Sequence, residues 1–411
     1  MATVVLAGTL DTKGPEYAFV RSRLREVHGV DTVLVDVGIV GIADTAADVP
    51  RDAVARAAGT DVATLAAAGD RGAAVETMAL GLTAIVKRLH AEGRLDGIIG
   101  LGGSGGSSLI THAMRALPLG VPKLMVSTVA SGDTRPYVGA SDITMMYSVI
   151  DIAGINSVSA PILANAAAAI AGMASAPKPV AGARKPLVGA TMFGVTTPCV
   201  TRARERLEEL GYEVLVFHAT GSGGQSMEAL VRDGFLDAVL DITTTELADD
   251  LVGGVLSAGP HRLEIAGERG IPQVVSVGAL DMVNFGPADT VPERFAARKF
   301  VKHNATVTLM RTTPEENAEL GRRIARKLSA ARGPVTLFIP LRGVSAIDVA
   351  GGIFSDPAAD TALFDALRGG IGPNVILREI DTDINDPAFA LALADELHAL
   401  VQARVPQGVA R

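Results

Sequence analysis

The sequence predicts an α/β fold of parallel strands and helices, organised as two domains. Short β-branched runs alternate with segments of helical periodicity, a pattern typical of parallel strands joined by crossover helices. A segment rich in proline and charge interrupts this alternation once, and the pattern then starts again. A chain of 411 residues with 48% hydrophobic content is also long enough to bury two cores.

In the first half, four apolar runs are predicted as strands, at residues 3–8, 32–37, 97–101 and 123–128. The segment 75–91 carries apolar residues at helical spacing, and Gly93 follows it as a helix stop. The longest apolar stretch, 160–176, is rich in alanine and interrupted by Pro161 and Asn165. It is too weakly apolar to span a bilayer, so we expect a buried or interfacial helix there.

The domain boundary is predicted at residues 176–186, where three prolines and three charged residues break the periodicity. This places the N-terminal domain at residues 1–178 and the C-terminal domain at residues 185–411. Each domain is expected to contain a mainly parallel sheet, with a ligand cleft between or beside the two.

After the boundary the strand and helix pattern restarts. A strand is predicted at 187–192, Pro198 opens a helix, and the next strand is predicted at 212–217. The first helix of each half carries a similar sequence, at residues 21–26 and 204–209. We infer two related domains, without strict repetition.

A glycine-rich turn joins an apolar strand to a helical pattern at residues 95–108. Gly100, Gly102 and Gly105 fit the spacing G-x-G-x-x-G, which allows a tight turn and a close approach of the backbone to phosphate. Backbone N–H groups and a helix N-terminus at such a junction attract anions. The predicted phosphate contacts are Gly102, Gly103, Ser104, Gly105, Gly106 and Ser107.

Two familiar nucleotide motifs are not complete here. In an NAD-binding fold an acidic residue closes the next strand, but the run 123–128 ends in hydroxyl side chains. No lysine follows the glycines as a P-loop requires. The alternative interpretation is that the glycines serve only turn geometry and close helix packing.

Further candidates follow the first and fourth predicted strands, because ligands bind outside the carboxyl ends of parallel strands. Lys13 is predicted to pair with phosphate and Asp11 to hold Mg²⁺, in a loop before a helix that starts near Pro15. The alternative is that the polar side chains of this loop cap that helix. The candidates in the two loops are Thr9, Asp11, Thr12, Lys13, Ser127 and Thr128, with Ser131, Asp133 and Asp142 as further ribose or metal contacts or turn residues.

The second half contains another Gly-Ser-Gly-Gly sequence at 221–224 and the polar run Thr243–Glu246, which follows a predicted strand. Thr244, Glu246, His303 and Arg311 suggest a small polar or anionic compound in the cleft. His303 and Arg311 could form an anion clamp, although an alternating strand with polar flanks explains them equally.

Three other residues of the second half have both a functional and a structural interpretation. His261 and Glu264 are spaced i, i+3 on a predicted helix, which suits a metal or proton relay, but we favour a capping or surface role. Arg342 follows a predicted strand and is placed to meet a charged group. The sequence shows no convincing catalytic base beside an acceptor.

Composition narrows the class of partner. The net charge of −8 gives no broad attraction for nucleic acid. The single cysteine, Cys199, excludes an internal disulfide; near a helix N-terminus it would be reactive if exposed, but a buried position is favoured. The first residues lack the basic region of a signal peptide. We expect a cytoplasmic protein with neither nucleic-acid nor membrane partners.

Several phrases of the sequence resemble an uncharacterised family related to the N-terminal half of the tomato mosaic virus resistance protein. They lie at residues 7–14, 102–106, 141–146, 273–286 and 308–313. The resemblance runs over nearly all of the chain. It implies two Rossmann-like domains, an ATP-binding site with Mg²⁺ and a tendency to form dimers.

The resemblance places nucleotide contacts in the phrases at 9–14 and 102–107. We therefore expect an ATP-binding protein with a magnesium-dependent site on the glycine-rich loops of the N-terminal domain, and a homo-oligomer. Two hypotheses remain open at this point. The protein is either an enzyme that uses ATP on a small metabolite or a non-catalytic module that responds to the nucleotide.

Overall fold

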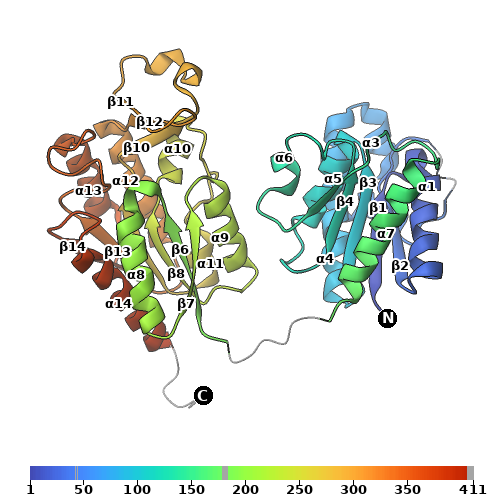
Figure 1. Ribbon diagram of the computed structural model, residues 1–411, viewed down its shortest axis with the longest axis horizontal. Coiled ribbons are helices and arrows are strands. Elements are labelled where there is room, and N and C mark those ends of the chain that lie inside the picture. The colour runs from blue at the N-terminus through green and yellow to red at the C-terminus, as the bar shows by residue number, and fades with distance from the viewer. Residues whose placement is uncertain (42, 44, 178–183, 405–411) are drawn as a thin grey trace. The chain divides into compact units, whose positions relative to one another are not determined.

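A computed structural model describes residues 1–41, 43, 45–177 and 184–404 (Figure 1). The chain divides into two compact units, Met1–Val180 and Ala181–Arg411, and each is described by itself. Part of the predicted boundary segment 176–186 lies outside the described residues.

The N-terminal unit contains a five-stranded sheet in the order β2-β1-β3-β4-β5, and all of its strand pairs are parallel. The first four strands follow the sequence prediction to within a residue or two at their ends. The fifth was not predicted, because it is a four-residue edge strand with exposed ends. The strands are β1 (Thr3–Gly8), β2 (Asp31–Asp36), β3 (Gly97–Gly102), β4 (Lys123–Ser127) and β5 (Thr144–Tyr147).

Helices cover both faces of this sheet, because the strand side chains alternate between two apolar cores. Val5 and Ala7 of β1 face a core shared with α2, α4 and α5, whereas Val4 and Leu6 face a core shared with α1 and α7. The predicted buried helix at 160–176 is α7. The helices are α1 (Leu10–Ser22) with a π-helical end (Arg23–Val27), α2 (Arg51–Ala57), α3 (Val62–Ala68), α4 (Arg71–Ala91), α5 (Ser104–Met114), α6 (Arg135–Val138) and α7 (Ser159–Ser175).

The C-terminal unit contains a six-stranded parallel sheet in the order β14-β13-β9-β8-β6-β7. A separate three-stranded antiparallel sheet has the order β10-β12-β11. The strands are β6 (Leu187–Met192), β7 (Glu213–His218), β8 (Ala238–Thr243), β9 (Gln273–Gly278), β10 (Met282–Phe285), β11 (Phe300–Lys302), β12 (Thr308–Arg311), β13 (Val335–Pro340) and β14 (Val375–Ile380).

One face of the six-stranded sheet packs on α8 and α14, and Cys199 is fully buried in that core. Burial also raises the pKa of its thiol, so the prediction of an inert buried cysteine is confirmed. The helices of this unit are α8 (Thr197–Glu209), α9 (Ser222–Arg232), α10 (Glu246–Val252), α11 (Ile265–Arg269), α12 (Pro314–Ser329), α13 (Pro357–Gly370) and α14 (Pro387–Arg404).

Both parallel sheets belong to the α/β class and have a Rossmann-like arrangement. In the N-terminal sheet the chain runs outward from β1 to β2 and then returns to the other side of β1 as β3. The connections after β1 and β3 therefore leave in opposite directions, and the carboxyl ends of these two strands flank a crevice. Within the described part of the chain, no helix combines the length and apolarity needed to cross a membrane.

Tyr17 joins the two strands at this crevice. Its hydroxyl donates to the carbonyl oxygen of Ala7 at 2.5 Å and accepts a hydrogen bond from the Leu101 amide at 2.7 Å. The ring is fully buried and lies where a side chain at Gly8 would be, since a Cβ there would be 2.0 Å from it. Burial raises the pKa of the Tyr17 phenol, so it stays protonated and can donate.

Candidate functional site

A cavity of about 610 Å³ lies at the carboxyl edge of the N-terminal sheet. It is lined by the connections that follow β1, β2 and β3 and by residues of α3 and α4. The structure brings to it most of the predicted site residues, namely Thr9, Asp11, Thr12, Lys13, Gly103, Ser104, Gly105 and Gly106. Gly102, Ser107, Ser127 and Thr128 are not among the residues described as its lining.

The glycines of the loop after β3 have two different roles. A Cβ at Gly100 would lie 2.6 Å from the Ile110 side chain, and one at Gly102 would lie 3.1 Å from the backbone of Gly106, so close packing requires both. A Cβ at Gly103 would lie 3.7 Å from the Thr128 hydroxyl, and one at Gly105 would lie 3.9 Å from Nη2 of Arg71, so neither position is crowded. These two glycines therefore present backbone to the cavity, where the first turn of α5 has N–H groups without intrahelical acceptors.

The segment after β1 is helical from Leu10, which is earlier than predicted. The backbone at Lys13, with φ −135° and ψ 24°, is not helical and divides α1 by a kink, so the part after the kink starts near Pro15 as predicted. Lys13 donates from Nζ to the carbonyl oxygen of Ile152 at 2.6 Å. The hydroxyls of Thr9 and Thr12 lie 2.8 Å apart and share a hydrogen bond.

Asp11 connects this loop to the one after β2 instead of capping α1. Its Oδ2 accepts hydrogen bonds from the amides of Ile39 and Val40 at 3.1 and 3.0 Å, and Arg51 lies 4.0 Å away. The carboxylate side chain is only 5% exposed. Its Oδ1 is buried without a hydrogen-bond partner among the described residues.

Ser107 and Ser127 stabilise the glycine loop from the buried interior of the unit. Both are fully buried, and their hydroxyl oxygens lie 2.6 Å apart in a shared hydrogen bond between α5 and β4. Asp142 is paired with Lys123 at 2.6 Å, and Asp133 is paired with Arg135 at 2.7 Å. Hydrogen bonds from Arg135 lower the pKa of Asp133 to about 2. Both acids are paired with neighbouring cations, and neither is among the residues that line the cavity.

Sequence reasoning missed the α4 side of the cavity. Asp70 caps α4 by accepting a hydrogen bond from the Ala73 amide at 3.0 Å, and Arg71 is the first residue of that helix. The helix was predicted to start at residue 75, although an aspartate before a helical pattern is a recognised start signal. The apolar part of the lining comes from four segments, the loop after β2 and helices α3, α4 and α5, and comprises Val37, Ile39, Val40, Leu65, Ala66, Ala74, Val75 and Leu109.

At the second Gly-Ser-Gly-Gly sequence, which starts α9, backbone amides bind a carboxylate of the protein itself. The amides of Gly221 and Gly224 donate to Oε1 of Glu246 at 2.7 and 3.0 Å. Oε2 of Glu246 accepts from Nε of Arg262 at 2.7 Å, and the same guanidinium makes a bidentate pair with Asp241 at 2.6 and 2.7 Å. All three charged side chains are at most 1% exposed.

The expected cleft residues of the C-terminal unit are also buried in internal networks. Thr244 and Glu246 are fully buried, and Arg311 is 5% exposed and paired with Asp348 and Asp360 at 3.0 and 2.7 Å. The anion clamp predicted from Arg311 is therefore wrong. Thr191 donates to Asp241, and Thr196 shares a hydrogen bond with Thr243.

Two surface predictions can also be placed. His261 and Glu264 lie in a turn before α11, not on a helix, and His261 Nδ1 is 2.9 Å from the carboxylate of Glu264. The favoured surface role is consistent with this exposed pair. Arg342 makes an exposed bidentate pair with Asp381, which accounts for its charge.

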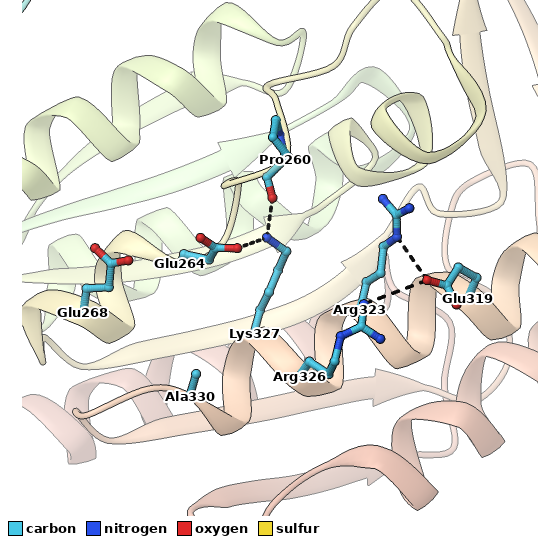
Figure 2. Close-up of a pocket in the computed structure, with 8 residues that line it drawn as sticks. All are labelled: Pro260, Glu264, Glu268, Glu319, Arg323, Arg326, Lys327 and Ala330. Atoms are coloured by element: carbon cyan, nitrogen blue, oxygen red, sulfur yellow. Dashed lines mark hydrogen bonds and ion pairs between the residues drawn. The ribbon is translucent and has the colours of Figure 1, made fainter.

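A second cavity, of about 480 Å³, lies in the C-terminal unit beside α12 and is lined mainly by charged side chains (Figure 2). Lys327 contacts Glu264 and the carbonyl oxygen of Pro260, and Arg323 donates to Glu319 at 3.2 Å. Because these opposite charges satisfy one another across a partly exposed surface, the arrangement provides no ligand-specific chemistry. The cavity of the N-terminal unit is the better candidate.

Comparison with known proteins identifies the family. The model of the "Uncharacterised protein family (UPF0261) N-terminal domain" matches residues 2–179, and that of its C-terminal domain matches residues 185–401. A UPF0261 protein of Clostridium tetani is 54% identical over 395 residues, which cover 96% of this chain and 98% of that protein. A UPF0261 protein of Rhizobium meliloti is 49% identical over 394 residues, with 95% and 97% coverage.

A plant protein is similar as well. The ToMV resistance protein Tm-1(GCR237) of Solanum lycopersicum is 45% identical over 413 residues, which cover 95% of this chain and 55% of the tomato protein. A solved structure of a putative UDP-N-acetylglucosamine 2-epimerase from Listeria monocytogenes aligns over 67% of this chain and 78% of that one at 10% identity, but its TM-score of 0.25 is too low to support an argument. The two domain models and the relatives together show that this chain belongs to the uncharacterised protein family UPF0261.

Proposed function

We propose that the N-terminal unit binds ATP together with Mg²⁺ in the cavity at the carboxyl edge of its sheet. The observation that carries this proposal is the open glycine loop at the crevice between β1 and β3. In sheets of this strand order, ligands bind at that position. The choice of ATP among nucleotides rests on the family resemblance already noted in the sequence.

The phosphate tail would lie against the first turn of α5. The unpaired N–H groups of that turn and its helix dipole favour negative charge. Gly103 and Gly105 leave the space above these amides free. Lys13 also lines this cavity, and among the described residues its ammonium has a carbonyl partner and no carboxylate partner, so its charge is available to pair with phosphate.

The base would pack against the apolar side of the cavity. Val37, Ile39 and Val40 supply this surface from the loop after β2, and Leu65 and Val75 supply it from the helices beyond. A mostly apolar wall with a few polar groups is typical of small-molecule sites.

Asp11 would hold the magnesium ion. Its unpartnered Oδ1 provides one oxygen ligand in a residue that lines the cavity. Among the described residues there is no group of three or more potential metal ligands. The residues present fit Mg²⁺ nonetheless, because this ion usually binds through one or two carboxylates, phosphate oxygens and water. When bound, the ion would neutralise phosphate charge.

The test compares two glycine variants that carry the same chemical change. Gly105→Val places a side chain over the α5 amides and should abolish ATP binding measured by isothermal titration calorimetry with Mg²⁺. Gly172→Val, on the exposed side of α7 and in open space, should bind ATP as the unaltered protein does. Equal ATP affinity in all three proteins would rule out the loop as the phosphate site. A repeat with EDTA should weaken binding in the unaltered protein.

A second measurement distinguishes an enzyme from a nucleotide-responsive module. Phosphate and ADP release with Mg²⁺ would be followed in the presence of pooled small polar and anionic metabolites. Turnover that is lost in Gly105→Val would establish catalysis at this site. ATP-dependent thermal stabilisation without turnover would favour the module.

A further inference from the structure

The cavity contains one cationic side chain that the fold itself does not use. Lys13 is bonded to the carbonyl oxygen of Ile152. Arg71 also lines the cavity, and its guanidinium has neither a hydrogen bond nor an ion pair with any residue that the structure describes. Most other arginines among the described residues form an ion pair with a carboxylate. Arg51, for example, pairs with Asp36 at 2.8 Å.

The position of Arg71 relative to the glycine loop is specific. Its Nη2 lies 3.9 Å from the point that a Cβ at Gly105 would occupy. The guanidinium is therefore on the side of α5 where the backbone is bare. The backbone of Arg71 is fixed, because it is the first residue of the 21-residue helix α4 and Asp70 caps that helix. Only its long side chain is free to move.

We infer that Arg71 closes over the phosphate tail of the bound nucleotide, opposite the amides of α5. This inference rests on the proposed function and adds a residue that gives the site selectivity for polyphosphates. A guanidinium presents several N–H donors in one plane and binds phosphate oxygens in a bidentate manner. We call the α5 amides and the Arg71 guanidinium together the clamp. Its amides are fixed in place, whereas its guanidinium moves onto the phosphate when phosphate binds.

The clamp predicts that the contribution of Arg71 to binding affinity depends on the number of phosphates in the ligand. Arg71 contributes to the binding of ATP and of inorganic tripolyphosphate, and contributes nothing to adenosine. Loss of a charged hydrogen-bonding partner should weaken binding of the first two ligands roughly 10- to 100-fold. The contact is exposed to solvent, so the part of the affinity that depends on Arg71 should also decrease with added salt.

The test measures the affinity of ATP, AMP, adenosine and tripolyphosphate for the unaltered protein, Arg71→Ala, Arg71→Lys and Arg88→Ala. Arg88 is an exposed arginine near the other end of α4, and its removal should change none of the affinities. Arg71→Ala should reduce the preference for ATP over adenosine by roughly 10- to 100-fold and should weaken the salt dependence, with the α5 amides and Lys13 accounting for the remainder. Arg71→Lys should recover part of both, because it restores the charge without the bidentate geometry.

The outcomes separate the two proposals. If Arg71→Ala binds ATP and tripolyphosphate as tightly as the unaltered protein, while Gly105→Val does not bind them, the clamp is wrong and the nucleotide site stands. If the unaltered protein binds tripolyphosphate but no nucleotide, the proposed function is wrong, and the Arg71 variants still test the clamp. If neither ligand binds the unaltered protein, both proposals are overturned.

Discussion

The two Gly-Ser-Gly-Gly sequences of this chain are identical in composition but opposite in environment. In the N-terminal unit the loop starts α5 and faces a cavity of about 610 Å³. In the C-terminal unit it starts α9, and two of its amides already bind the carboxylate of Glu246. The motif therefore predicts a place where backbone can bind an anion, but it does not predict whether that anion is a ligand or a side chain of the protein.

The glycines meet different requirements in the two loops. Gly103 has φ −80°, which any residue can adopt, whereas Gly221 has φ +84°, which favours glycine. A Cβ at Gly224 would lie 2.1 Å from Oε2 of Glu246, while one at Gly105 would be 3.9 Å from Nη2 of Arg71. Packing therefore requires glycine at position 224 of the C-terminal loop, whereas at position 105 of the N-terminal loop there is space for a side chain.

The largest effect should follow removal of the internal anion. Glu246→Ala leaves Arg262 fully buried with fewer negative partners, and it leaves two glycine amides without their acceptor. Breaking a buried ion pair in this way should lower the free energy of unfolding by about 3–5 kcal/mol. Urea denaturation measures the loss, and added formate should restore part of it by entering the vacated site.

The control for this change is Asp381→Ala, which breaks the exposed pair with Arg342 and should leave the urea midpoint unchanged. Glu246→Gln retains an oxygen acceptor for the glycine amides and should be less destabilising than Glu246→Ala. Unchanged stability of Glu246→Ala would mean that the carboxylate is not needed to complete the C-terminal loop.

A second prediction compares one glycine variant from each of the two loops. Gly224→Ala forces a methyl group against Glu246 and Arg262 and should cost about 1–3 kcal/mol of stability, without affecting ATP binding. Gly105→Val should show the reverse pattern, with lost ATP binding and little change in stability. Paired calorimetry and urea denaturation of both variants would contradict the comparison if each changed the same property.

The smallest effect concerns pH and also belongs to the C-terminal unit. Asp281, Asp348 and Asp360 surround Arg311, and Asp356 adds a further carboxylate near Asp360. Burial, together with the charge of Asp281, raises the pKa of Asp348 from 3.8 to about 9. The folded protein therefore holds a proton that the unfolded chain releases above pH 4, so this carboxyl group lowers stability progressively as pH rises toward 9.

Asp348→Asn removes that titration, and its single amide oxygen can keep one of the two hydrogen bonds that Asp348 accepts, from Arg311 or from the Val344 amide. Its stability should fall less than that of the unaltered protein between pH 5 and pH 8, with a difference of about 1 kcal/mol or more at pH 8. Parallel stability profiles for the two proteins, measured by urea denaturation across this range, would show that Asp348 does not retain the proton.

Local patterns in the sequence predicted much of the fold and part of the site. Strands β1 to β4 and the start of α8 at Pro198 follow from hydrophobic runs and helix signals that lie within a few residues of one another. Strand β5 was missed because its four residues sit at a sheet edge and lack a buried pattern. The residues that face the cavity after β1 and β3 were predicted because strand ends can be located in sequence.

Contacts between distant residues could not be predicted in the same way. Ser107 and Ser127 were assigned to the ligand, but they are 20 positions apart and hydrogen bond to each other. Glu246 lies 22 positions after Gly224, and its carboxylate reaches back to that glycine through the fold. Neither contact produces a periodic pattern in the sequence. The position of Arg71 beside the glycine loop was not predicted, because it comes from the approach of α4 to α5.

The hydroxyl of Tyr17 has a consequence for the mechanics of the site. One phenol is anchored to the backbone of β1 at Ala7 and to that of β3 at Leu101, directly below the loops that line the cavity. These two strands are also paired directly along the sheet, from Val4 with Gly97 to Ala7 with Gly100, so the phenol adds a side-chain link where the backbone pairing ends. Tyr17 is outside the described lining of the cavity, so Tyr17→Phe would remove this link between the two loops while leaving every lining residue unchanged.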